Sequence, residues 1–170
     1  MNMINEIISK KKINEKNNEL ASLINSNESK DIVILGVMNG SFYFMKDLMD
    51  KLKIDFKYDF LFCSSYFGET KSSGKVDFIY PNKVDISDKD VFVLEDIIDT
   101  GRTIIEIKKR LEDYGPRSIN FCSLLIRDSF KSKINIFWTG YKIKNEFVVG
   151  YGLDYKGEYR NLDHICELVL

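Results

Sequence analysis

The chain has 170 residues, a composition that is ordinary for a globular protein, and a net charge of −1 from 25 basic and 26 acidic residues. This length predicts one domain that buries about 70% of the surface of its unfolded chain. The even charge balance argues against a broad surface for nucleic acid or anionic membrane, although it allows a local basic pocket. No apolar run approaches the ~20 residues of a membrane span, so we expect neither nucleic acid nor membrane as a partner.

Cysteine and histidine usage argues against a disulfide framework and a zinc site. Cys63, Cys122 and Cys166 lack C-x-x-C spacing, and we interpret them as small apolar core residues. Their odd number and the absence of a secretory signal predict a location in the reducing cytoplasm. His164 is the only histidine and is expected to be structural, so no His/Cys metal site can be assembled.

The first part of the chain is predicted to form helix, strand, turn and helix. Apolar residues recur at three- and four-residue spacing from Met1 to Ser26, which predicts a helix. The apolar run Ile32–Val37 predicts a strand, and the turn Met38–Ser41 leads into a second predicted helix, Phe42–Leu52. The apolar residues of this second helix either face a sheet or form an interface between subunits, and both interpretations remain open.

A predicted hairpin with a long polar loop follows. Asp55–Ser65 alternates partly between apolar and polar residues, and Val76–Tyr80 can return as its partner strand. The stretch between them, Tyr66–Lys75, is polar and rich in Gly and Ser. We expect it to be a mobile lid loop over a binding site.

The most informative stretch is Val91–Thr103, VFVLEDIIDTGRT. Its four apolar residues Val91–Leu94 predict a strand buried on both faces, as in a parallel sheet. Two acids follow the strand, and a helix is predicted over Thr103–Tyr114, ended by Gly115-Pro116. Ligands of open α/β sheets bind at such a place, beyond the carboxyl ends of the strands.

The turn before this helix has the chemistry of a phosphate site. Gly101 can adopt a positive φ, and the free N–H groups of the helix start point at an anion. Thr100 and Thr103 add hydroxyl donors beside Arg102, whereas Asp99 would repel a phosphate and must face another part of the ligand or cap the helix. The P-loop and G-x-G-x-x-G patterns are both absent.

The two acids Glu95 and Asp96 before this turn have two interpretations. They can simply solvate the end of a strand, or they can bind vicinal hydroxyls. With a small phosphate loop a few residues later, the second interpretation is favoured, and a ligand such as ribose 5-phosphate has the required shape.

The remaining chain is rich in strands. Strands are predicted over Ser118–Ile126, Ile134–Thr139 and Glu146–Gly150, with a loop over Leu153–Asn161 and a final extended piece, Ile165–Leu170. The whole pattern predicts an α/β fold: a Rossmann-like parallel five-stranded core with flanking helices and right-handed crossovers. The single domain, 1–170, would have its core at about 31–150, a flexible lid loop, and a small hood from about 1–30 and 151–170.

LEDIIDTGRT resembles the signature of the type I phosphoribosyltransferases, and its double isoleucine resembles the hypoxanthine-guanine branch. Four further blocks match in order: ILGVMNGSFYFMKDL, SSYFGETKSSGKV, YGPRSINFCSLL and EFVVGYGLDYKGEYRNLDHI. The resemblance implies a pentosyltransferase of purine salvage. It would transfer 5-phosphoribosyl from phosphoribosyl pyrophosphate to hypoxanthine and/or guanine, giving IMP or GMP and pyrophosphate. It also implies Mg²⁺ as cofactor and a homodimer or homotetramer.

The resemblance also implies roles for individual residues at the sugar end. Glu95 and Asp96 would bind the ribose hydroxyls and their metal. Asp99 would be the general base for N7 of the purine. This role requires a pocket that excludes water, in which the pKa of Asp99 can rise. The 5-phosphate loop would comprise Asp99, Thr100, Gly101, Arg102 and Thr103.

Other residues would bind pyrophosphate and purine. Asn39, Gly40 and Arg160 would contact pyrophosphate, and Asp154 would be the second magnesium ligand. The purine would lie among Ile98, Arg127, Phe147, Val148 and Asp154, with the ring of Phe147 stacked on it and the backbone of Val148 reading its edge. Ser65 and Tyr66 would form the tip of the lid loop, which excludes water.

Two positions depart from the family pattern. Asn39 stands where many members have lysine, so we expect pyrophosphate to be bound there through the N–H groups of Asn39 and Gly40. Arg127 stands where a lysine usually reads the 6-oxo group of the purine, and its planar fork makes this a non-neutral change. A 6-oxopurine is still favoured over adenine, because Arg127 offers donors and no acceptor.

Two other functions are weighed against the enzyme. A non-catalytic nucleotide-sensing regulator of the same fold would not need the predicted base Asp99 or the second metal ligand Asp154. A binder of another phosphosugar would not need the FVVGY–LDY block, which supplies a stacking ring and a metal carboxylate together. Turnover of phosphoribosyl pyrophosphate with a purine separates the enzyme from both.

Overall fold

The larger sheet of the computed structural model has six strands in the order β4-β3-β2-β5-β6-β7. The structure describes residues 3–29, 31–65, 76–81, 83–131 and 133–169. Strands β2, β3, β5, β6 and β7 pair in parallel, and β4 pairs antiparallel with β3. The predicted parallel five-stranded core and the predicted hairpin are therefore confirmed. The strand bounds are β2 Ile32–Met38, β3 Lys57–Ser65, β4 Val76–Ile79, β5 Asp90–Ile98, β6 Ser118–Arg127 and β7 Ile136–Ile143.

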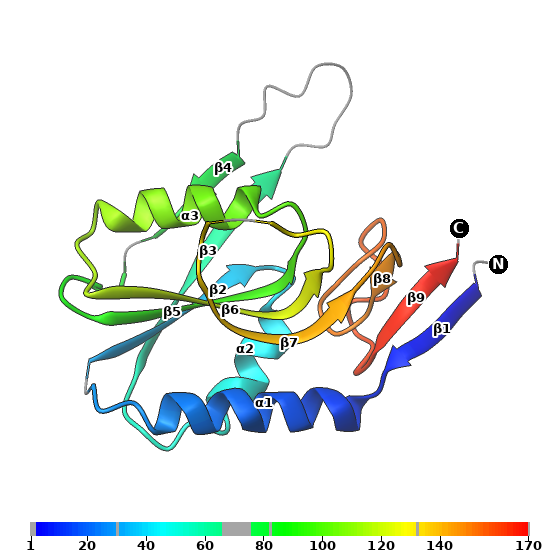
Figure 1. Cartoon of the computed structure of the whole chain (residues 1–170), viewed down its shortest axis with the longest axis horizontal. Helices are drawn as coiled ribbons and strands as arrows, with labels where there is room; N and C mark the ends of the chain where they lie inside the picture. The colour runs from blue at the N-terminus through cyan, green and yellow to red at the C-terminus, as the bar shows by residue number, and fades with distance from the viewer. Residues whose placement is uncertain (1–2, 30, 66–75, 82, 132, 170) are drawn as a thin grey trace.

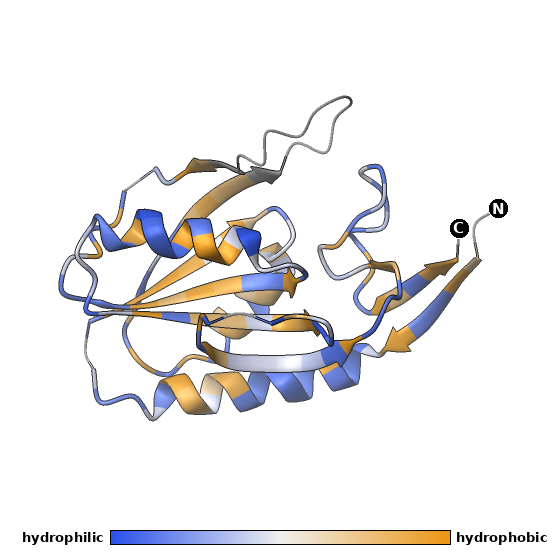
Figure 2. Cartoon of the chain, turned by 45° about the horizontal axis from the view of Figure 1, so that its top comes forward, coloured by the Kyte–Doolittle hydropathy of each residue, from blue (hydrophilic) through white to orange (hydrophobic). Residues whose placement is uncertain are grey.

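Helices cover both faces of this sheet (Figure 1). Alternate residues of β2 and β5 point to opposite faces, as strand geometry requires. Ile34 and Phe92 pack with the helices α1 and α2, whereas Val33 and Val93 pack with α3. In Figure 2 the strands of the larger sheet are mainly hydrophobic, while α1 and α3 carry residues of both kinds. The helix bounds are α1 Lys10–Asn25, α2 Phe42–Met49 and α3 Arg102–Glu112.

The N-terminal prediction of one helix is wrong in its first part. Met3–Ile8 forms strand β1, which pairs antiparallel with β9, Ile165–Val169. Helix α1 begins only at Lys10, where the side chain of Ser9 accepts a hydrogen bond from the N–H of Lys12. The apolar spacing before Ser9 could not reveal this, because the partner strand lies at the other end of the chain. Strand β8, Val148–Val149, completes a three-stranded sheet in the order β1-β9-β8.

Strand β7 differs from its prediction because it continues through Gly140. At that position a Cβ would lie 2.5 Å from the carbonyl oxygen of Leu124 on β6, so the glycine permits close strand packing rather than ending the strand. Trp138 is 5% exposed and belongs to the core, as predicted. Cys122 and Cys166 are also buried and Cys63 is half-buried, which confirms their interpretation as apolar core residues.

None of the helices in the described part of the chain combines the length and apolar character that a membrane crossing needs. The predicted lid, Tyr66–Lys75, lies outside the described residues. Ser65 is the last residue of β3. The predicted loop before β9 contains two short bridges, Gly150–Leu153 and Tyr155–Glu158, that fold it back on itself.

Candidate active site

Three turns meet at the carboxyl ends of neighbouring parallel strands. They comprise residues 38–41 after β2, 99–101 after β5, and 128–130 after β6. Because β2, β5 and β6 are neighbours and run in parallel, these turns share one edge of the sheet. Helices α2 and α3 begin at this edge. The predicted site residues of the first two turns are thus brought together.

The turn after β5 is open to an anion. Gly101 adopts φ +80°, the positive value predicted for it, and helix α3 begins there without a side-chain cap. Among the described residues the N–H of Gly101 has no acceptor, and the N–H of Arg102 reaches only the hydroxyl of Thr100, at 3.5 Å. The suggested role of Asp99 as the helix cap is therefore wrong. Free N–H groups at a helix start favour a phosphate.

The ring of Phe130 lies over this turn from the end of β6. A Cβ at position 101 would approach Cε2 of Phe130 to 2.4 Å, so the turn requires glycine for space as well as for φ. The sequence analysis did not identify Phe130. Its only sequence signal is a position just beyond β6, at the shared edge.

Of the paired acids at the end of β5, Glu95 is buried and Asp96 is half-buried. Glu95 is 8% exposed, and its Oε2 has no hydrogen-bond partner in the structure. Burial raises the pKa of the Glu95 carboxyl well above its ordinary range, and the neighbouring charge of Asp96 raises it further. Burial also raises the pKa of Asp96, although the N–H of Ile97, 2.8 Å from its Oδ1, partly offsets this. Two negative charges side by side are thus disfavoured here, and a cation or ligand donors would offset that cost.

This pair fits a hard divalent cation. Two adjacent carboxylates with an unpartnered buried oxygen supply the ligands that Mg²⁺ prefers. No group of three or more His, Cys, Asp or Glu side chains among the described residues could enclose a metal. Mg²⁺ typically binds one or two carboxylates and completes its shell with water and substrate phosphates, so a pair is sufficient.

Two glycines allow three segments to touch beside Asp96. A Cβ on Gly40 would lie 1.8 Å from Oδ2 of Asp96, and a Cβ on Gly152 would lie 2.0 Å from the carbonyl oxygen of Gly40. The peptide bond between Met38 and Asn39 in the same turn is cis. The predicted pyrophosphate turn is therefore in direct contact with the acids on one side and with the 150–154 segment on the other.

Asp154 and Arg160 lie next to this contact and bind each other. Nη2 of Arg160 is 2.6 Å from Oδ1 of Asp154, and Nη1 donates to the carbonyl of Gly152 at 2.5 Å. The N–H of Gly157 donates to the other oxygen of Asp154. The charge of Arg160 also counteracts the burial that raises the pKa of Asp96. The predicted second metal ligand and the predicted pyrophosphate arginine thus form one cluster.

Arg127 contacts both the predicted base and the segment that carries the predicted stacking ring. Its Nη1 donates to the backbone carbonyls of Lys144, at 2.7 Å, and Glu146, at 2.8 Å. Its Nε lies 3.7 Å from Oδ1 of Asp99, whose side chain is 66% exposed. Nη1 of Arg127 is therefore already hydrogen-bonded to the backbone, and Nε already lies near Asp99.

The other predicted purine-binding residues differ in exposure. Phe147 is 42% exposed, and its ring meets the ring of Tyr155 edge to face. The side chain of Val148 is buried in β8, which is compatible with a role for its backbone. The side chain of Ile98 is buried under α3, so only its backbone can face a ligand. His164 pairs with its neighbour Asp163, which agrees with a structural role.

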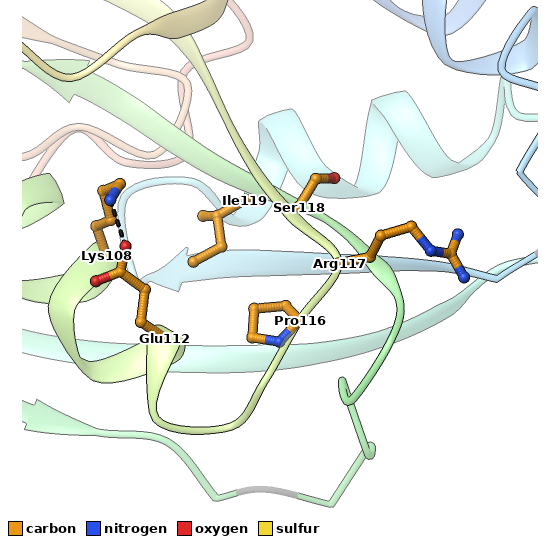
Figure 3. A pocket seen from close by; sticks show the side chains of 6 residues that line it. All are labelled: Lys108, Glu112, Pro116, Arg117, Ser118 and Ile119. Atoms are coloured by element: carbon orange, nitrogen blue, oxygen red, sulfur yellow. Dashed lines mark hydrogen bonds and ion pairs between the residues drawn. The ribbon is translucent and has the colours of Figure 1, made fainter.

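A separate pocket lies at the opposite ends of the strands (Figure 3). It is lined by residues of α3 and by Ser118 and Ile119, which begin β6. Its charged groups are paired within the chain, Lys108 with Glu112 and Arg117 with Asp90. It contains none of the predicted site residues, so we do not assign the chemistry to it.

Comparisons with known proteins agree with this geometry. The family model described as "Phosphoribosyl transferase domain" matches residues 3–156. A hypoxanthine-guanine phosphoribosyltransferase of Lactococcus lactis is 37% identical over 161 residues, which cover 94% of this chain and 87% of that protein. A hypoxanthine phosphoribosyltransferase of Buchnera aphidicola is 36% identical over 170 residues, with 98% and 96% covered.

Solved structures show the same similarity. A crystal structure of a hypoxanthine-guanine phosphoribosyltransferase from Bacillus anthracis superposes with a TM-score of 0.89 at 38% identity, covering 97% of this chain and 98% of that one. Hypoxanthine phosphoribosyltransferase from Trypanosoma cruzi, in complex with the product IMP, gives a TM-score of 0.86 at 27% identity, covering 96% and 93%.

Proposed function

The chain belongs to the phosphoribosyltransferase family, and from this premise we propose how its residues perform the reaction. The protein is a purine salvage enzyme that transfers 5-phosphoribosyl from phosphoribosyl pyrophosphate to hypoxanthine and/or guanine. The products are IMP or GMP and pyrophosphate. Nothing in these relatives favours the alternative of a regulatory module. The supporting observation is the acid pair, buried Glu95 and half-buried Asp96, placed just before an open glycine turn at the sheet edge.

The sugar is held at both ends by the last residues of β5 and the turn that follows it. The N–H groups of Gly101 and Arg102, with the hydroxyls of Thr100 and Thr103, donate to the 5-phosphate at the start of α3. Glu95 and Asp96 accept from the ribose hydroxyls. These acceptors also stabilise the positive charge that develops near carbon 1 as its bond to pyrophosphate weakens, as in glycoside cleavage.

We assign the metal to Glu95 and Asp96, with Asp154 as a second ligand position. Bound there, Mg²⁺ would neutralise charge on the pyrophosphate leaving group. The pyrophosphate itself is bound by the N–H groups of Asn39 and Gly40 and by Arg160. Asp154 already pairs with Arg160, so pyrophosphate would compete with Asp154 for that guanidinium.

The purine lies between Asp99 and Phe147. Asp99 accepts the purine proton through N7 while a ring nitrogen bonds to carbon 1 of the ribose and the carbon–pyrophosphate bond breaks. Phe147 stacks on the purine, and the backbones of Val148 and Ile98 contact its edges. Arg127 offers only donors, so it suits a 6-oxo group. Its Nη1 is already shared by two carbonyls, which leaves Nε and Nη2 for the purine and Asp99.

Subunit assembly is a further part of the proposal. We propose a homodimer or homotetramer. Phe42 at the start of α2 is 52% exposed, whereas Phe44, Met45 and Leu48 of the same helix are buried. Helix α2 therefore serves chiefly the core, and only its exposed side is available to another subunit.

A spectrophotometric assay tests this function. Purified protein is mixed with phosphoribosyl pyrophosphate, Mg²⁺ and hypoxanthine, guanine, xanthine or adenine, and nucleotide formation is followed. We expect turnover with hypoxanthine or guanine and none with adenine. A control variant, Asp113→Asn, changes an exposed carboxylate at the C-terminal end of α3. It should leave turnover unchanged. Binding of phosphoribosyl pyrophosphate without turnover would favour the regulatory module.

A further inference from the structure

The segment Gly150–Gly152 has positive φ at three successive residues, and the middle one is a large aromatic residue. Gly150, Tyr151 and Gly152 have φ values of +96°, +51° and +100°. Positive φ is easy for glycine but strained for a bulky residue such as tyrosine. Such a conformation persists only when the surroundings determine it. The contacts of Tyr151 must therefore hold this conformation in place.

The buried hydroxyl of Tyr151 is the centre of a polar network that is partly buried. The residue is 4% exposed, and its hydroxyl accepts a hydrogen bond from Nδ2 of Asn17 on α1 at 2.9 Å. The hydroxyl donates to Oδ2 of Asp47 on α2 at 2.8 Å, and the backbone carbonyl of Tyr43 lies 3.3 Å away. One oxygen atom thus joins the 150–154 segment to both helices on that face of the sheet.

The same segment touches the predicted pyrophosphate turn from its other side. The Cα of Gly152 abuts the carbonyl of Gly40, and Arg160 donates to the carbonyl of Gly152. Helix α2, to which the Tyr151 hydroxyl is bound, begins directly after this turn. The short segment Tyr151–Gly152 therefore contacts the turn directly through Gly152 and also binds α2, which follows the turn, through the hydrogen bond from Tyr151 to Asp47.

We propose that Tyr151 is a positioning residue for the pyrophosphate end of the site. Its hydroxyl fixes the separation between the Asn39–Gly40 turn on one side and the Asp154–Arg160 pair on the other. It acts through these groups and touches no reacting atom. The inference rests on the proposed function of the site, because it is that function that places pyrophosphate between the two segments.

The variant Tyr151→Phe removes the hydroxyl and keeps the ring. Asp47 and Asn17 then lose a shared buried partner, and the segment loses its fixed position relative to α2. We expect the KM for phosphoribosyl pyrophosphate to rise about 5- to 30-fold, which corresponds to about 1–2 kcal/mol, because the lost hydrogen bond is to a charged but part-exposed carboxylate. The KM for hypoxanthine should stay within about twofold, because the purine is bound by other segments.

The matched control is Tyr80→Phe. Tyr80 is also a buried tyrosine, and its hydroxyl donates to the carbonyl of Val84 at 2.6 Å on the α3 side of the sheet. We expect it to lower thermal stability about as much as Tyr151→Phe while leaving both KM values unchanged. Asp47→Asn keeps an acceptor for the hydroxyl and should retain a near-normal KM. Asp47→Ala should behave like Tyr151→Phe, and the double variant should be no worse than either.

The affinity for phosphoribosyl pyrophosphate with Mg²⁺, measured by calorimetry, gives a readout that does not need turnover. A weaker affinity in Tyr151→Phe but not in Tyr80→Phe supports the inference. A normal affinity, or an equal rise in both KM values, overturns it. If the unaltered protein binds phosphoribosyl pyrophosphate but forms no nucleotide, the proposed enzyme function fails while the calorimetric comparison still decides the role of Tyr151.

Discussion

The contact between Gly40 and Asp96 allows a test worked directly from the geometry. In Gly40→Ala the new Cβ would lie 1.8 Å from Oδ2 of Asp96 and 2.5 Å from its Cγ. This is about 1.6 Å short of the ~3.4 Å at which ordinary contact begins. Gly40 has no positive φ, so alanine causes no backbone strain and the effect is steric. Either the carboxylate of Asp96 or the pyrophosphate turn must move.

The expected loss follows from that displacement. A misplacement of about 1 Å in a catalytic constellation can cost about 10²-fold in rate, and overpacking a buried contact costs roughly 1–3 kcal/mol of stability. We therefore expect kcat/KM for phosphoribosyl pyrophosphate to fall about 10²-fold. The free energy of unfolding should fall by no more than about 3 kcal/mol, so that the protein still folds.

Steady-state kinetics and urea unfolding measure the two effects. The control is Gly115→Ala, at φ +66°, where the new Cβ would have only Oγ of Ser87 near it, at 3.9 Å. It should lose about 1 kcal/mol of stability and no activity, because it strains the backbone without reaching the acids. If Gly40→Ala keeps kcat/KM within about threefold of the unaltered protein, the placement of sugar and metal at Asp96 is refuted, because a shift of this size must be felt there.

Three further substitutions test other parts of the site. Asp99→Asn should keep affinity for phosphoribosyl pyrophosphate but slow turnover by roughly 10²-fold or more, the scale for a general base; unchanged turnover would remove that assignment. Arg127→Lys loses the planar guanidinium, whose Nη1 binds two backbone carbonyls before Phe147 while its Nε lies 3.7 Å from Asp99, so it should raise the KM for purines and alter the ratio of hypoxanthine, guanine and xanthine use; an unaltered ratio would show that Arg127 does not read the base. Glu95→Gln should abolish the Mg²⁺ dependence of phosphoribosyl pyrophosphate binding yet stabilise the free protein near pH 7 by about 0.5–2 kcal/mol. In the folded state the pKa of Glu95 is raised above its ordinary 4.5, so the folded state holds the proton more tightly and the unaltered protein loses stability as pH rises through this range. Urea unfolding across pH 4 to 8 checks this sign, and a variant less stable than the unaltered protein at pH 7 contradicts it.

The part of the site formed by β5 and the turn after it could be predicted from the sequence, because the residues that determine it are neighbours in the chain. A four-residue apolar run, two acids and a glycine before a periodic segment specify strand, turn and helix within a few residues. The positive φ of Gly101 and the burial of Val91–Leu94 follow from that pattern and are observed.

The features that the sequence did not reveal depend on contacts between distant segments. Strand β1 was predicted as helix because its partner, β9, lies at the other end of the chain. The contacts of Gly152 with Gly40 and of Tyr151 with Asp47 join segments more than a hundred residues apart. A Gly-Tyr-Gly run signals an unusual backbone, but not what it will touch.

The same limit applies to Arg127. From the sequence, its side chain was predicted to read the 6-oxo group because arginine offers donors and no acceptor. The structure shows that Nη1 alone donates to two carbonyls of a neighbouring segment while Nε lies 3.7 Å from Oδ1 of Asp99, so the guanidinium spans two parts of the site. Only the fold places those carbonyls within its reach.

A crystal structure of the protein with IMP and Mg²⁺ would test the assignment of the sugar and phosphate sites most directly. We expect the 5-phosphate within hydrogen-bond distance of the N–H groups of Gly101 and Arg102, and the ribose hydroxyls at Glu95 and Asp96. A nucleotide whose phosphate lies elsewhere, for example at the pocket beside Lys108 and Arg117, would contradict the assignment.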